Sequence, residues 1–211
     1  MTPLDPVRSA PLNVGRCPAP EFKTLAARLS TSLSATLGAP RPLRYDRDAG
    51  PASALPAHVR AASAIRRQGT RLVILQDDVS ALVLLDPVTG STRSALLPAG
   101  EGGARVFDAG LGNKKFKLDL EASVVLPDGR LLALGSGSSR RREQIATLAA
   151  EPGASALLSS GAQLYASLRA HAEARDAPLN IEGAVIQGDW LRLLQRGYGK
   201  HRRAPWNAIL D

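Results

Sequence analysis

The chain has 211 residues, 44% of them hydrophobic and 22% charged, so it is long enough to bury a sizeable core and has the balance of an ordinary globular protein. Its single cysteine excludes an intramolecular disulfide framework, and no apolar run approaches the roughly 18 residues needed to span a bilayer. The N-terminus lacks a basic segment followed by an apolar one, so we expect no signal peptide, no membrane association and a cytoplasmic location.

The formal net charge of +8 is typical of proteins that bind anions. Aromatic residues make up only 4% of the chain, which leaves few platforms for stacking bases and argues against nucleic acid as the partner. We expect a small anionic ligand instead. Two denser basic clusters, at 140–142 and within 196–203, are either solvated loops or the rim of an anion-binding pocket.

The first forty residues differ from the rest of the chain. Five prolines within residues 1–20 predict an extended tail, because proline does not fit inside regular structure. Apolar residues at spacings of three and four over Glu21–Leu37 predict a helix, which Gly38 and Pro40 end. We expect 1–40 to lie outside the repeats that follow.

A pattern of strand, glycine-containing turn and strand recurs three times after this segment. Its copies begin at Ala62, Glu121 and Glu182, 59 and 61 residues apart. A period of this size built from short antiparallel strands is typical of a β-propeller, in which each repeat is one four-stranded blade.

The apolar runs predict three such units over about 58–98, 117–160 and 179–211. Their strands are expected near 60–66, 71–76, 81–85 and 92–97, then near 120–126, 130–135, 143–149 and 155–158, and finally near 182–187, 190–195 and 207–211. A short strand at Arg41–Tyr45 and an inserted helix at Gln163–Ala174 complete the prediction.

The sequence therefore predicts an all-β dominated fold, a partial (incomplete) β-propeller of about three antiparallel blades over 41–211 with an N-terminal helix and one inserted helix. Closed propellers need 4–8 blades, so three blades would leave open sheet edges. Either the chain is a truncated piece of a longer protein, or it forms a homodimer through these edges, or its N-terminal segment covers the gap.

Two glutamates occupy the same position in the repeat. Glu121 and Glu182 each begin a strand expected to be innermost in its blade, and Asp119 lies two residues before Glu121 on the same face of the strand. Carboxylates that converge on one axis repel each other and need a cation or a shared proton. Ligation by oxygen alone favours calcium or magnesium. We therefore predict Asp119, Glu121 and Glu182 as catalytic residues, with Glu121 and Glu182 as metal ligands; the alternative is that each glutamate only accepts hydrogen bonds from backbone amides.

Polar and basic loops flank these carboxylates. A lysine-rich segment precedes Asp119, a Gly/Ser loop follows the second strand of the second unit, and a Gln-Arg-Gly loop takes the same place in the third unit. Amides, hydroxyls and cations at equivalent loops would form an anion-binding mouth. The predicted substrate-binding residues are Lys114, Lys115, Ser136, Ser138, Arg140, Gln195 and Arg196. The alternative is that these loops are flexible turns.

Three stretches resemble a group of uncharacterised bacterial propeller-like proteins that are related in pattern to the esterase-like domain of phytases. They are Phe107–Ala122, Leu134–Ser138 and Leu179–Ala184 with Gln195–Gly197, and the likeness covers roughly 41–211. The resemblance implies a propeller with a polar channel mouth. It also implies carboxylates at the starts of inner strands, as in calcium-dependent propeller hydrolases.

Two functions remain open at this point, and with them the question of whether the protein is an enzyme. The first is a metal-assisted hydrolase of phosphoesters or related anionic esters, with Glu121 and Glu182 holding the cation and Asp119 acting as a further ligand or base. The second is a non-catalytic propeller module that binds a protein or small ligand on its loop face. A chain that folds only by dimerising is a third hypothesis. The sequence contains no Gly-x-Ser-x-Gly elbow, P-loop or dinucleotide fingerprint.

Overall fold

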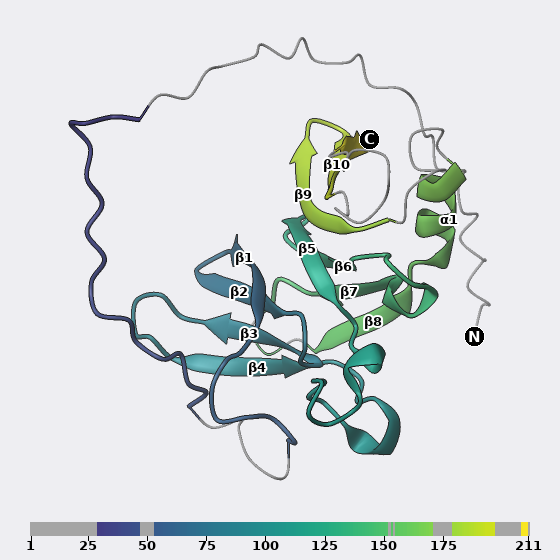
Figure 1. The fold of residues 1–211 in the computed structure, drawn as a ribbon, viewed down its shortest axis with the longest axis horizontal. Helices are drawn as coiled ribbons and strands as arrows, with labels where there is room; N and C mark the ends of the chain where they lie inside the picture. Colours follow the sequence, from purple (N-terminus) through teal and green to yellow (C-terminus); the bar gives the residue numbers. More distant parts are fainter. Residues whose placement is uncertain are drawn as a thin grey trace, which may run out of the picture.

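The computed structural model describes residues 29–46, 53–151, 153, 155–170, 179–196 and 208–210. Within these residues the strands form three open antiparallel sheets, each in chain order, and helices are few (Figure 1). The first sheet contains β1 (Ala62–Gln68), β2 (Arg71–Gln76), β3 (Ala81–Leu85) and β4 (Thr92–Leu96). The second contains β5 (Leu120–Val125), β6 (Leu131–Gly135), β7 (Gln144–Leu148) and β8 (Ala156–Ser160). The third contains β9 (Ile181–Gln187), β10 (Trp190–Gln195) and β11 (Ala208–Leu210).

The helical elements are short. In the part of the chain that the structure describes, one α-helix, α1 (Ala162–Ala170), follows the second sheet, and three single turns of 3₁₀-helix lie in loops: η1 (Glu101–Gly103), η2 (Lys114–Phe116) and η3 (Arg140–Arg142). No helix among the described residues is long and apolar enough to cross a membrane.

The strand predictions are confirmed for all three sheets, with bounds that differ by at most two residues. The first two strands of each sheet are joined at Gly69, Gly129 and Gly188, whose φ angles of 60°, 84° and 59° only glycine adopts without strain. The inserted helix is confirmed as α1, and the last four residues of that prediction lie outside the described residues. The short strand predicted at Arg41–Tyr45 is reduced to an isolated bridge with His58.

The predicted N-terminal helix is wrong over the part that the structure describes. Residues 29–37 contain no helix, and Leu29, Leu33 and Leu37 are 96%, 80% and 94% exposed. A short amphipathic helix depends on tertiary packing of its apolar face, which these leucines lack. Serine and threonine interrupt the segment and favour local bonds, such as that from the Ser32 amide to the Ser30 hydroxyl. Residues 1–28, with the predicted tail and the start of the helix, lie outside the described residues.

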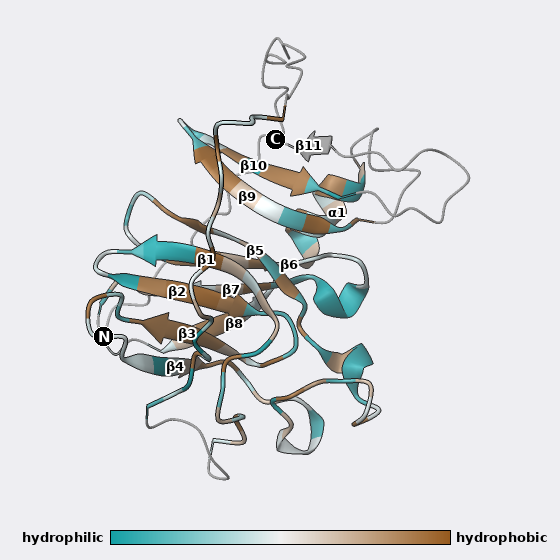
Figure 2. Cartoon of the chain, turned by 60° about the vertical axis from the view of Figure 1, so that its left-hand side comes forward, coloured by the Kyte–Doolittle hydropathy of each residue, from teal (hydrophilic) through white to brown (hydrophobic). Residues whose placement is uncertain are grey.

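Strands such as β2 and β3 consist largely of hydrophobic residues (Figure 2), and the buried side chains form three apolar clusters. The cluster between the first and second sheets includes Val73, Leu75, Leu82, Leu97, Leu120, Leu131 and Leu148. The cluster between the second and third sheets also contains Tyr165 and Leu168 from α1. A third cluster covers the other face of the first sheet with Tyr45 and Leu55 from the preceding segment. Burial on both faces explains why β2 and β6 are nearly continuous apolar runs rather than alternating ones.

Candidate functional site

The same irregularity begins the first strand of every sheet. The pairing register shifts so that one residue, Ser63 in β1, Glu121 in β5 and Glu182 in β9, has no partner in the second strand. A β-bulge of this kind re-aims a side chain away from the regular alternation. The equivalent of Glu121 in the first sheet is therefore Ser63, one residue after the Ala62 that the sequence repeat indicated.

The loops after the second strands are equivalent as well. The amides of Asp77, Ser136 and Arg196 donate to the carbonyls of the residues two positions before each bulge, at 3.0, 2.9 and 3.0 Å. In the second sheet that carbonyl belongs to Asp119, whose φ of 57° is uncommon for a residue other than glycine but is tolerated by aspartate. The repeated backbone bond thus fixes each loop side chain next to a bulge.

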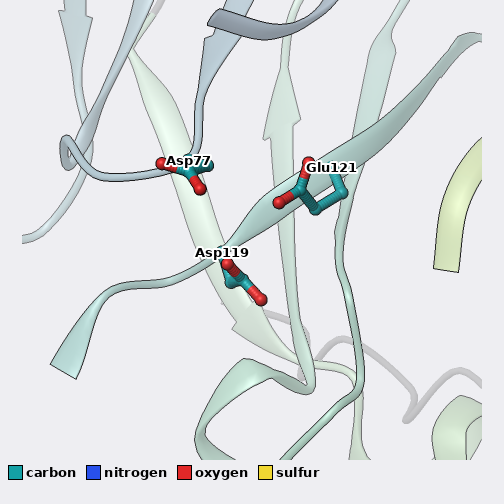
Figure 3. A group of neighbouring side chains, drawn as sticks. All are labelled: Asp77, Asp119 and Glu121. Carbon is teal, nitrogen blue, oxygen red and sulfur yellow. The ribbon is translucent and has the colours of Figure 1, made fainter. Parts of the chain in front are cut away.

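Three carboxylates from two sheets meet at this point. Oxygens of Asp77, Asp119 and Glu121 all lie within 4.8 Å of one another. Figure 3 shows the Asp77 and Glu121 side chains extending towards each other near Asp119. We call these three residues the carboxylate centre. Asp119 is 5% exposed, and the other two are partly buried.

Lys117 already supplies a positive charge to this centre. Its ammonium lies 2.6 Å from Asp77 Oδ2 and 2.5 Å from Asp119 Oδ1, and the residue is 7% exposed. Burial lowers the pKa of Lys117, but its hydrogen bonds to Asp119 and Asp77 and their charges outweigh burial, so the pKa is raised. Lys117 therefore stays protonated and bridges two sheets.

The second oxygen of Asp119 is also occupied. The hydroxyl of Ser136 donates to Oδ2 at 2.6 Å, and Arg142 Nη1 lies 3.1 Å from the same atom. The hydroxyl of Ser138 shares a hydrogen bond of 2.8 Å with that of Ser136 and accepts one from Arg142, also 2.8 Å. The Ser136 hydroxyl thus holds Asp119 in place, and Ser138 links that hydroxyl to Arg142.

Glu121 is the exception among these acids. Within the described part of the chain its carboxylate has no hydrogen-bond or ion-pair partner. Its pKa is raised from 4.5 to about 7, first by desolvation and then by the charges of Glu182, Asp119 and Asp77, with Lys117 acting in the opposite direction. The carboxyl group of Glu121 thus changes its protonation state near neutral pH.

Glu182 acts on Glu121 through its charge but has partners of its own. Its Oε1 accepts a hydrogen bond of 2.7 Å from the Asn180 side chain and lies 2.9 Å from Arg196 Nη2. Gln195 is 3% exposed, accepts from the Asn180 amide at 2.8 Å and donates to the Arg196 carbonyl. Of these two predicted substrate-binding residues, Arg196 is available at the surface, with 63% of its side chain exposed, whereas Gln195 orients the loop.

The remaining predicted cations lie in a different group. Lys114, Lys115 and Arg140 are exposed and, within the described residues, make no ion pair with the carboxylate centre. The structure therefore places Ser136, Ser138, Gln195 and Arg196 in the networks around Asp119 and Glu182, and Lys114, Lys115 and Arg140 outside these networks.

Sequence reasoning did not include Asp77, a member of the carboxylate centre, or Lys117 and Arg142, which pair with its acids, in the predicted site. Asp77 follows the second strand at the position of Ser136 and Arg196, so the repeat contained a signal for it. Lys117 is one of three lysines in the segment before Asp119. The sequence pattern of this segment does not indicate which of the three side chains is buried. Arg142 contacts Asp119 through a loop whose path no local pattern specifies.

Comparison with known proteins gives one match. A family model described as a family of unknown function (DUF6929) matches residues 58–211. No curated protein and no solved structure matches significantly. The comparisons therefore provide no link to phytases or to propellers.

Proposed function

The chain belongs to this family of unknown function, and we propose from its carboxylate centre that it is a hydrolase of phosphoesters or related small anionic esters in which Glu121 transfers the proton. The observation that carries the proposal is the carboxyl group of Glu121. It has a pKa of about 7 and no partner among the described residues, beside two carboxylates that are themselves paired. General acids and bases work best when their pKa lies near the working pH.

The neighbouring side chains assign the roles. Lys117 and Ser136 hold the Asp119 carboxylate in place, and its charge helps to raise the pKa of Glu121. Ionised Glu121 would accept a proton from a water molecule while the oxygen atom of that water attacks the phosphorus atom of the ester. The ester P–O bond then breaks, and protonated Glu121 would return the proton to the leaving oxygen. Arg196, exposed beside Glu182, would bind the anionic group.

The same centre fits calcium or magnesium, since all its donors are carboxylate oxygens. Asp77, Asp119 and Glu121 would hold the ion, with Glu182 as a more distant charge. The Lys117 ammonium bridges Asp77 and Asp119, so the ion would have to displace it. When bound, such an ion polarises a phosphoester and lowers the pKa of a coordinated water.

We also propose that the three sheets are blades of a partial propeller with this centre at its hub. Support comes from their first strands, because β5 lies between β1 and β9 (Figure 1). Arg66 on β1 donates to the carbonyls of Ser123 on β5 and Ala184 on β9, at 2.7 and 2.9 Å. The shared bulge gives all three strands the same local form.

Hydrolysis of para-nitrophenyl phosphate and bis(para-nitrophenyl) phosphate, with and without calcium or magnesium, tests the enzymatic proposal. Glu121→Gln should lower kcat/KM by about a hundredfold, the contribution of a general acid–base group. It should also remove an inflection near pH 7 from the rate profile. Glu101→Gln, at an exposed acid in η1, is the matched control and should leave the rate unchanged. Equal rates for both variants would refute a role for Glu121 in catalysis.

A second candidate, a non-catalytic binding module, is favoured by a different observation. Asp77, Asp119 and Glu182 all have cationic partners within the chain, as structural carboxylates do. On this account no ester in the panel is hydrolysed, and Glu121→Gln changes only stability.

A further inference from the structure

A second charged feature lies outside the carboxylate centre. Two turns of 3₁₀-helix from separate loops, η2 and η3, meet at the ring of Phe116. The Arg141 guanidinium lies 4.8 Å from the ring centroid and the Lys115 ammonium 5.0 Å from it. Lys114 and Arg140 are the neighbouring residues on the same turns. We call Lys114, Lys115, Arg140 and Arg141 with Phe116 the Phe116 patch.

The charges of this patch are largely uncompensated. Within the described part of the chain, Lys114, Lys115 and Arg141 have no ion pair. Arg140 is 80% exposed and 3.6 Å from Glu143. Glu143 is shared with Arg169, which approaches it to 2.5 Å, so it does little to neutralise Arg140.

Holding these cations together costs free energy that local structure does not explain. Lys115 and Arg141 each lie about 5 Å from one ring centre, which places them within the Debye length of about 10 Å at 0.1 M salt. Attraction of each cation to the ring offsets part of their repulsion. An anion bound between them would remove the rest.

We infer that the Phe116 patch binds a compact polyanion with closely spaced phosphate groups, of the size of a di- or triphosphate. Two arginines provide planar forks that match phosphate oxygens, and two lysines add point charges beside them. Lys115 and Arg141 lie over one ring, and Lys114 and Arg140 are their neighbours on the same two turns, which suits a small ligand with high charge density. A nucleic-acid strand needs a longer basic track with several aromatic platforms. This inference does not rest on the proposed hydrolase function, because the patch cations are not paired with the carboxylate centre.

Calorimetric titration with inorganic tripolyphosphate at 50 and 200 mM salt tests the inference on the full chain. The double variant Lys115→Gln/Arg141→Gln should bind roughly tenfold more weakly, since it loses two charge-assisted contacts. Wild-type affinity should fall steeply at the higher salt. The control, Arg67→Gln/Arg93→Gln, removes the same charge from exposed positions of the first sheet and should stay within about twofold of wild type.

Three results would overturn the inference. One is no binding by wild type at 50 mM salt. Another is an equal loss of affinity in both double variants, which would assign binding to net charge rather than to the patch. The third is tighter binding of a twelve-nucleotide single strand than of tripolyphosphate. Both double variants change exposed side chains, and their melting temperatures verify that they are folded.

Discussion

At the scale of single residues, the acids of the carboxylate centre differ in whether they have hydrogen-bond or ion-pair partners. Asp119 is buried and accepts from Lys117 and Ser136, so its charge is stabilised. Glu121 lies beside it without a partner among the described residues, and burial together with neighbouring charge keeps its proton in place. Two acids separated by one residue thus have different partners, and only Glu121 lies where burial outweighs the nearby cation.

The raised pKa of Glu121 makes stability depend on pH. The folded pKa of about 7 exceeds the reference value of 4.5, so between these values the folded state binds more protons than the unfolded state. The free energy of unfolding therefore falls as pH rises from 4.5 to 7, and it stays lower above that. Glu121→Gln should escape this loss and be more stable than wild type at pH 8, by about 1 kcal/mol once partial exposure is taken into account. Melting temperatures of both proteins between pH 4.5 and 8 measure the difference, and parallel curves would contradict the assignment.

Lys117 should be essential for folding stability. Lys117→Met leaves the carboxylates of Asp77 and Asp119 without their shared cation, at a cost of about 3 kcal/mol near pH 7. Denaturant unfolding compares this variant with Lys115→Met at an exposed position of the preceding turn. Equal stability of the two variants at pH 7 would show that the bridge contributes nothing.

At the scale of elements, the repeated first strand is the organising unit. The bulge in this strand occurs in all three sheets, and so does the backbone hydrogen bond that the residue just before the strand accepts from the loop after the second strand. Side-chain bonds then join one sheet to the next, such as that from the Ser63 hydroxyl to the Leu120 carbonyl at 2.6 Å. The position of each acid is therefore set by backbone geometry before any side chain packs.

Arg66 tests how strongly the first strands depend on one another. Arg66→Met removes the bonds from β1 to the Ser123 and Ala184 carbonyls and should lower the free energy of unfolding by about 2 kcal/mol. Arg67→Met, next to it, loses only a bond to Gly69 in its own turn and should change stability by less than about 0.5 kcal/mol. Urea denaturation of the two variants measures this difference. Indistinguishable midpoints would contradict a stabilising role for the hydrogen bonds of Arg66.

Much of this architecture was predictable from the sequence, and the exceptions have physical causes. Apolar runs with a glycine turn between them specify strands, so β1 to β11 were expected near their observed places. The bulge in β1 puts Ser63, rather than Ala62, at the position that Glu121 occupies in β5. Counting the period of the repeat does not detect this offset of one residue. The apolar spacing through Leu29 to Leu37 predicted a helix, but no partner surface covers those leucines. Asp77 reaches this centre only through a contact between sheets, its ion pair with Lys117, which itself lies two residues before Asp119.

At the scale of the whole molecule, stability comes from apolar contact between sheets. Leu131 on β6 is fully buried in the cluster between the first and second sheets, and Leu157 on β8 is 69% exposed. Leu131→Ala should lower the free energy of unfolding by about 3 kcal/mol, because it removes buried methyl groups and leaves a cavity. Leu157→Ala should change it by less than about 0.5 kcal/mol. Thermal denaturation measures both, and equal melting temperatures would show that the sheets do not share a core.

The carboxylate centre exists only where these sheets meet, and its defining property is the proton that Glu121 retains. Carbon-13 NMR of the glutamate side-chain carboxyl groups, titrated from pH 3 to 9 in wild type and in Glu121→Gln, measures that property directly. We predict one resonance with a midpoint near pH 7 that is missing from the variant. Should the resonance that disappears in the variant titrate in wild type near 4.5, the usual value for glutamate, the proposed centre would be contradicted.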